Sequence, residues 1–164
     1  MVTDKAIVAD YSLLLVLKRS GKLKGEAVIP GHEGEIIVLD FEYGARADSK
    51  DNSLDTAVRR LPELKIMKSA DRSTTGLLQA CSSGEQIKEA VLSARRAGAL
   101  ETDFFKLTFE NAFVSSFTTK LERGSMPIEE IKISYQSVEI QYRPQLGNGQ
   151  HGPVSTARVD IGKD

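Results

Sequence analysis

Candidate nucleophilic chemistry is concentrated in residues 73–85, STTGLLQACSSGE, which contain the only cysteine of the chain. Cys81 is followed by two serines and Gly84, and a thiolate becomes a nucleophile when a neighbouring base takes its proton. The side chains of a type able to act as that base are His32 and His151, and both lie among glycines, as turn residues commonly do. Because free cysteine is among the most buried residue types, we interpret Cys81 as a packing residue and both histidines as loop or interface residues.

The remaining polar residues form no pattern that is typical of catalysis or cofactor binding. Asp40 and Glu42 could act as an acid and a base, but residues two apart on the outward face of a strand are ordinary solvated side chains. One cysteine and two histidines cannot complete a four-ligand zinc site. The Gly-rich stretches around the two histidines lack the lysine and the strand-to-helix context of a phosphate-binding loop. The sequence therefore predicts a protein that is not an enzyme and that uses neither a cofactor nor a metal.

The composition excludes several classes of partner. The chain has 164 residues, and its 22 Lys and Arg nearly balance its 23 Asp and Glu, for a net charge of −1. Such a balance does not favour nucleic acid or an anionic membrane as the main partner. The N-terminal apolar run, residues 13–17, is too short to span a bilayer or to form the core of a signal peptide. We expect a single domain over residues 1–164, with no nucleic acid partner and no membrane insertion.

Alternation of apolar and polar residues with a period of two predicts that the chain is mainly β-strand. Residues 35–43 are predicted to form a half-buried strand whose inner face carries Ile37, Leu39, Phe41 and Tyr43. Residues 104–118 show the same alternation, which predicts one long strand or a hairpin pair. In residues 129–144 the apolar residues change from odd to even positions, which predicts a β-bulge near residues 136–137.

One short helix is predicted within residues 73–85. Asp71 or Ser73 can cap its start, and Gly84 supplies the left-handed residue that commonly ends a helix. About three turns are too short to be stable alone, so the helix must dock on the sheet. The side chains predicted to make that contact are Leu77, Leu78 and Cys81.

Residues 43–63 differ from the rest of the chain because they are polar, charged and barely periodic. A segment of this kind is typical of a functional arm or a mobile loop, but a tolerated insertion remains an alternative. Its candidate partner-binding residues are Arg46, Asp48, Lys50, Asp51, Arg59 and Arg60. The many short strands and Gly-rich turns elsewhere predict a β-sandwich or a β-barrel.

The order of these segments resembles the haemolysin-coregulated protein (Hcp) family, the tube proteins of type VI secretion systems. Residues 13–44 resemble the opening of that family, with matching positions at Gly25, Glu26, His32, Val38, Leu39 and Phe41. The stretch STTGLLQACSSGE is similar to the family's helix, FENAFVSSF to its Val-Ser-Ser strand, VEIQYRPQ to its closing strand and GPVSTARVDI to its last strand. The resemblance covers essentially the whole chain.

The resemblance implies a fold and an assembly. The fold is a two-sheet β-barrel with one short α-helix packed on its side and an extended charged loop at about residues 44–58. Local composition favours a helix at residues 86–96, but the family has a strand there, and we predict a strand because tertiary context overrides propensity. The assembly is a homohexameric ring, and rings stack into a tube with a spike protein at its tip, a contractile sheath around it and small effector proteins in the ring lumen.

The resemblance also implies synthesis in the cytoplasm and secretion through the type VI system without a cleaved signal peptide. We expect the charged loop to contact the next ring or another partner, although in the family this loop is often Gly-rich. We further expect strands with two apolar faces, at residues 13–17 and 131–142, to bury their second face in the ring. A phage-tail-tube-like structural protein and a small-ligand-binding β-barrel are the alternative hypotheses.

Overall fold

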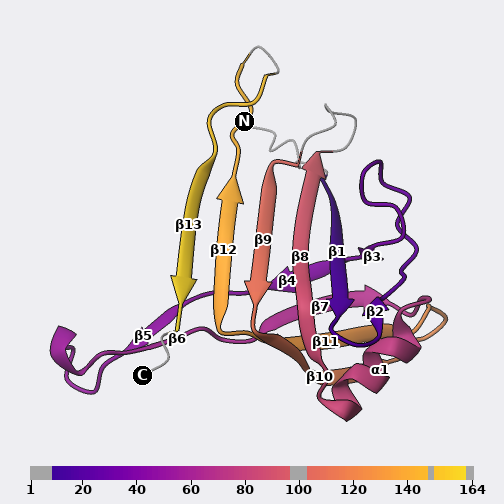
Figure 1. Cartoon of the computed structure of the whole chain (residues 1–164), viewed down its shortest axis with the longest axis horizontal. Helices are drawn as coiled ribbons and strands as arrows, with labels where there is room; N and C mark the ends of the chain where they lie inside the picture. Colours follow the sequence, from indigo (N-terminus) through magenta and orange to yellow (C-terminus); the bar gives the residue numbers. More distant parts are fainter. Residues whose placement is uncertain (1–8, 97–102, 148–149, 162–164) are drawn as a thin grey trace.

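The computed structural model describes residues 9–96, 103–147 and 150–161, which are mainly β-strand (Figure 1). The described chain starts with strands β1 (Ala9–Leu17), β2 (Gly21–Lys22), β3 (Ile36–Ile37) and β4 (Asp40–Glu42). Next come β5 (Arg46–Asp48), the 3-10 turn η1 (Leu54–Thr56), β6 (Val58–Arg60), β7 (Leu64–Ser69), the helix α1 (Thr74–Ser83) and β8 (Gln86–Arg96). The last strands are β9 (Phe105–Glu110), β10 (Ala112–Lys120), β11 (Ile128–Ser134), β12 (Ser137–Tyr142) and β13 (Ser155–Asp160).

Most of these strands belong to one curled antiparallel sheet. Its order is β13-β12-β9-β8-β10-β11-β7-β4, and β1 pairs with β8 while carrying the short strands β2 and β3. In Figure 1, strands β13, β12, β9, β8 and β1 stand side by side, and β4, β7, β10 and β11 run across their lower part. The sheet therefore curls into a half-barrel, which confirms the predicted barrel-like, mainly β fold with one short helix.

The curling occurs where two long strands bend together. Strand β9 continues into β10 through Asn111, whose φ of 51° lies in the left-handed region that Asn tolerates. Residues 104–118 thus form one long bent strand rather than a hairpin pair. Its partner bends at residues 135–136, between β11 and β12, so that β9 pairs with β12 and β10 pairs with β11.

The predicted β-bulge at residues 136–137 is wrong. Pairing runs up to Ser137 with Glu110 on one side of the bend and resumes at Ser134 with Phe113 on the other, so two residues lie between these pairs on each strand. A bulge needs an extra residue on one strand. The observed register shift lies instead inside β10, near Ser115. The change of apolar parity therefore marks a corner at which the chain passes from one layer to the other.

Apolar side chains fill the space between the layers. Alternate residues of β1, namely Leu13, Leu15 and Leu17, are buried, whereas Leu14 and Val16 on its other face are half-buried. At the bend, the rings of Phe109 and Tyr135 lie 4.8 Å apart in an edge-to-face arrangement. Burial of each large apolar side chain contributes about 1.5–3 kcal/mol to folding.

The predicted inner face of residues 35–43 is correct only in its second half. Ile36 and Val38 are buried, whereas Ile37 and Leu39 are exposed. The reason is a change of partner, because β3 pairs with β1 while β4 pairs with β7. The parity of inward-facing residues changes between the two strands, and Phe41 then packs against the core as predicted.

Residues 86–96 form strand β8, as predicted against their helical composition. β8 lies at the centre of the sheet, with β1 along one side and β9 and β10 along the other. Both of its faces are covered along residues 90–95, where Ala90, Leu92 and Ala94 are fully buried on one face and Val91 is buried on the other. Small and aliphatic residues on two buried faces suit a central strand, so tertiary context overrides helix propensity here.

The helix α1 docks on the sheet through Leu77 and Ala80, which are both buried. Gly84, the cap residue that follows its last residue, has a φ of 68°, as predicted for a left-handed cap. Leu78 does not make the predicted contact, because its position faces solvent and the residue is 55% exposed. Cys81 packs against the core but is only partly buried.

Within the described part of the chain, no helix has the length and apolar character needed to cross a membrane.

Candidate assembly surfaces

The charged segment singled out in the sequence forms an arm beside the half-barrel, consisting of β5, η1 and β6 (Figure 1). β5 and β6 pair only with each other in the described structure, with Arg46 opposite Arg60 and Asp48 opposite Val58. All six strand residues are exposed. A two-stranded ribbon is marginally stable alone in water, so contacts with a partner would stabilise the arm.

The ion pair in the arm contributes little to its stability. Arg46 Nε lies 3.2 Å from Asp48 Oδ2, and both side chains are exposed. Exposed pairs contribute about 0–1 kcal/mol and are screened by salt. The two arginines that face each other across the ribbon, Arg46 and Arg60, repel each other. The arm thus presents Arg59 and Arg60 on β6, with Lys50 and Asp51 in the turn before η1.

The arm also carries exposed apolar residues that were not predicted from the sequence to take part in binding. Leu54 in η1 is 85% exposed and Val58 in β6 is 52% exposed. A signal was present, because Leu54 is the lone large apolar residue in the polar stretch SKDNSLDT. Charge and apolar area together are typical of a protein-binding surface.

Strand β13 forms a second exposed surface that could bind a partner. It pairs with β12 on one side and lies at the end of the sheet order, so among the described strands its other edge carries no partner. All six of its residues are exposed, and Val159 and the following Ile161 are exposed large apolar side chains. An unpaired edge of this kind is a template for another chain.

Further exposed apolar side chains lie on the half-barrel itself. They are Ile37 in β3, Leu39 between β3 and β4, Phe113 on β10, and Leu121 and Met126 in the turn between β10 and β11. Together with the half-buried Leu14 and Val16 of β1, they show that several strands carry apolar residues on two faces. These apolar side chains are exposed to solvent in the single chain.

A buried ion pair fixes the start of α1 to the sheet. Lys68 of β7 lies opposite Glu129 of β11, and the Lys68 Nζ to Glu129 Oε1 distance is 2.5 Å. The same Nζ lies 3.0 Å from Asp71 Oδ1, and the Thr74 hydroxyl donates to Glu129 Oε2 at 2.8 Å. Of the two predicted caps, Ser73 is the N-cap residue, but its side chain caps no amide, and the Asp71 carboxylate instead accepts from the Ser73 amide at 2.8 Å in the turn before the helix.

Among the described residues, no hydrogen bond joins Cys81 to either histidine. Each ring nitrogen of His32 is hydrogen-bonded to a carboxylate, Glu35 on one side and Asp103 on the other. His151 forms an isolated bridge with Gln145 beyond the end of β12, whereas α1 lies near the opposite end of the upright strands (Figure 1). Among the described residues, no cluster of His, Cys, Asp and Glu could hold a metal ion.

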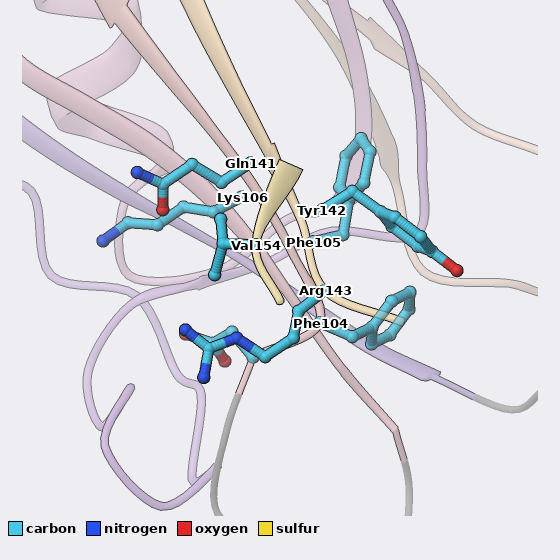
Figure 2. Close-up of a pocket in the computed structure, with 8 residues that line it drawn as sticks. Phe104, Phe105, Lys106, Gln141, Tyr142, Arg143 and Val154 are labelled. Carbon is cyan, nitrogen blue, oxygen red and sulfur yellow. The ribbon is translucent and has the colours of Figure 1, made fainter. Parts of the chain in front are cut away.

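A pocket of about 180 Å³ opens where β9 begins and β12 ends. Figure 2 shows the side chains of Lys106, Gln141 and Arg143 on one side of these strands and those of Phe104 and Tyr142 on the other. Its lining holds the cations Lys106 and Arg143, the carboxylate of Asp103 and the polar side chains of Gln141 and Tyr142, but no Ser, Cys or His. This arrangement is suited to contact with polar groups and does not form a catalytic constellation.

A sequence model of the family described as "Type VI secretion system effector, Hcp" matches residues 16–142. The chain belongs to the Hcp family. Protein hcp1 of Pseudomonas aeruginosa is 30% identical over 141 residues, which cover 82% of this chain and 87% of that protein. Two solved structures share the fold. A type six secretion system protein superposes with a TM-score of 0.81 at 23% identity, and the match covers 92% of this chain and 96% of that one. Hcp1 from Salmonella typhimurium superposes with a TM-score of 0.73 at 24% identity, and the match covers 93% of this chain and 95% of that one.

Membership in the Hcp family makes the chain a structural protein of type VI secretion and confirms the resemblance seen in the sequence. The structure explains one of the matching positions. A Cβ on Gly25 would lie 2.4 Å from the backbone oxygen of Glu35, and the Gly25 amide donates to Gly34 at 2.8 Å. Only glycine allows the two limbs of the loop between β2 and β3 to approach this closely.

Proposed function

We propose that this protein is the subunit of a hexameric ring, and that rings stack into the inner tube of a type VI secretion system. In this proposal, residues 1–164 act as one tube domain. The tube carries a spike protein at its tip, is surrounded by a contractile sheath and holds small effector proteins in the ring lumen. It is exported by that system without a cleaved signal peptide.

The observation that carries the proposal is the open edge of β13, with its exposed residues Val159 and Ile161. In a ring, each subunit joins its neighbour through two unlike surfaces, and a fixed rotation closes the circle. The β13 edge supplies one such surface, and the exposed apolar residues Ile37 and Leu39 supply a candidate for the other. Burial of these groups stabilises the ring because water is released from apolar area.

We assign ring stacking to the arm, including Arg46, Asp48, Lys50, Asp51, Arg59 and Arg60. Stacked rings must polymerise readily and also come apart after use, which requires modest contacts. Exposed ion pairs of about 0–1 kcal/mol, together with the small apolar area of Leu54, are suited to that balance. Raising the salt concentration should shorten tubes while hexamers persist.

Deletion of residues 46–58 tests this assignment. Hexamers should remain intact by light scattering, whereas tubes in electron micrographs and secretion should be lost. A finer variant is Leu54→Ser, which alters one residue that is 85% exposed and should change monomer stability by less than about 0.5 kcal/mol. Normal tube formation by the deletion variant would refute the assignment.

A further inference from the structure

His32 joins two segments that lie 71 residues apart in the sequence. It belongs to the loop between β2 and β3, and Asp103 lies two residues before the start of β9. His32 Nδ1 lies 2.9 Å from Glu35 Oε2, and His32 Nε2 lies 2.8 Å from Asp103 Oδ1. Glu35 is itself held by the hydroxyl of Ser12 on β1, which donates to Glu35 Oε1 at 3.0 Å.

This geometry requires a charged imidazole. A carboxylate only accepts hydrogen bonds, and a neutral imidazole has one N–H donor and one lone pair. The ring can donate to both Glu35 and Asp103 only when both of its nitrogens carry a proton. Burial opposes the charge and lowers the pKa of His32, but the hydrogen bonds to Asp103 and Glu35 outweigh burial and raise the pKa above 6.5.

The other charged groups around this site come from several elements. Arg95 of β8 donates to the backbone oxygen of Pro30, in the same loop, at 2.6 Å. Lys106 and Arg143 share the lining of the pocket with Asp103, and their positive charges oppose the protonation of His32. Glu33 lies next to His32 in the sequence, and its carboxylate accepts a hydrogen bond from the Gly31 amide at 3.2 Å. The two carboxylates in direct contact with the ring therefore set its charge.

We infer that charged His32 acts as a clasp that holds the loop between β2 and β3 against the start of β9, and that loss of its proton opens the clasp. The loop presents Val28, which is 87% exposed, so pH would control how this apolar residue is displayed to a partner. Because the proton is bound more tightly in the closed loop, closure is favoured at low pH. It weakens as the pH rises from the ordinary value of 6.5 through the pKa of the closed state.

Nitrogen-15 NMR of the histidine rings in the unmodified protein tests the clasp directly. His151→Gln assigns the two ring signals, because it leaves His32 as the sole imidazole. Both nitrogens of His32 should remain protonated beyond pH 6.5. A His32 titration midpoint at or below pH 6.5 would overturn the inference. Because this midpoint is measured on the unmodified protein, the result does not depend on whether a variant folds.

Two carboxylate variants separate the clasp from a general charge effect. Asp103→Asn should lower the His32 midpoint, because it removes the charge that faces Nε2. Glu33→Gln is the matched control, since it removes a carboxylate of the same loop that is not hydrogen-bonded to the ring. Equal midpoints in Asp103→Asn and the unmodified protein would contradict the clasp.

Hydrogen exchange then reports on opening of the loop. The amides of Gly25, Ala27 and Gly34 donate to backbone oxygens within the loop at 2.8–3.0 Å, so they are protected while the loop is closed. After correction for the intrinsic rate, their exchange should rise by up to about ten-fold per pH unit between pH 6.5 and the His32 midpoint. His32→Gln should remove this pH dependence, and an unchanged profile in that variant would also overturn the inference.

Discussion

Removing the charge of Lys68 should destabilise the fold more than any other single change at the start of α1. Lys68 is 1% exposed, and its Nζ faces both Glu129, which is fully buried, and Asp71. Lys68→Met leaves two buried carboxylates without a cation. Breaking a buried pair in this way costs about 3–5 kcal/mol. A change of 1 kcal/mol shifts the Tm of a domain of this size by about 2–4 °C, so the Tm should fall by at least about 6 °C.

The reciprocal variant should cost less. Glu129→Gln removes one of the two carboxylates, but Lys68 keeps Asp71 at 3.0 Å and the new amide still accepts from Thr74. We expect a loss of about 1.5–3 kcal/mol, the contribution of a hydrogen bond to a charged group. The double variant Lys68→Met with Glu129→Leu removes both charges of the closest pair and should recover much of the loss.

Lys65→Met is a matched control on the same two strands. Lys65 is partly exposed and its Nζ lies 3.8 Å from Glu130 Oε2, so this variant should cost no more than about 1 kcal/mol. The assays are urea unfolding for the free energies and thermal unfolding for the Tm, both followed by circular dichroism at one protein concentration, because assembly changes apparent stability. The reasoning would be refuted if Lys68→Met cost no more than Lys65→Met, or less than Glu129→Gln.

Three further predictions concern other parts of the fold. Gly25→Ala places a Cβ 2.4 Å from a backbone oxygen and should lower the free energy of unfolding by about 1–3 kcal/mol, as measured by thermal unfolding. Gly76→Ala is the control, because its Cβ meets only the flexible end of the Leu23 side chain and it should cost less. Equal costs for the two variants would contradict the close approach of the backbone at Gly25. Hydrogen bonds from the Ser20 hydroxyl and from the Ser20 and Arg19 amides lower the pKa of Glu85, so Glu85 stabilises the fold above pH 4.5 and this stability is lost as the pH falls. Glu85→Gln should therefore reduce the fall of Tm with decreasing pH below 4.5. An unchanged dependence of Tm on pH in this variant would argue against this role. Cys81→Ser should lower stability by about 1 kcal/mol without affecting secretion, and a loss of secretion from a stably folded variant would show that the thiol has a role beyond packing.

The sequence predicted the elements whose patterns are local. Alternation at a period of two identified the strands, and Gly84 marked the end of the helix with a left-handed residue. Strand β8 was predicted from the family resemblance against its own composition. It forms a strand despite its helix propensity because it pairs with β1 and β9 and its residues 90–95 are buried on both faces.

What the sequence could not predict depends on partners that are distant along the chain. The inner face changes between Val38 and Phe41 because β3 and β4 pair with different strands, and no local pattern encodes that change. The Lys68 and Glu129 pair spans 61 residues, and a charged residue in an amphipathic strand is ordinarily taken to face solvent. Leu78 was misplaced because a three-turn helix with few apolar residues does not define its buried face.

The measurement that tests the central claim most directly is electron microscopy of the purified 164-residue chain at micromolar concentration, with its mass in solution determined by light scattering. The account predicts ring-shaped particles whose averaged images have six-fold symmetry and a mass six times that of the 17.9 kDa chain. A stable monomer whose β13 edge and exposed apolar strand faces remain in water would contradict it.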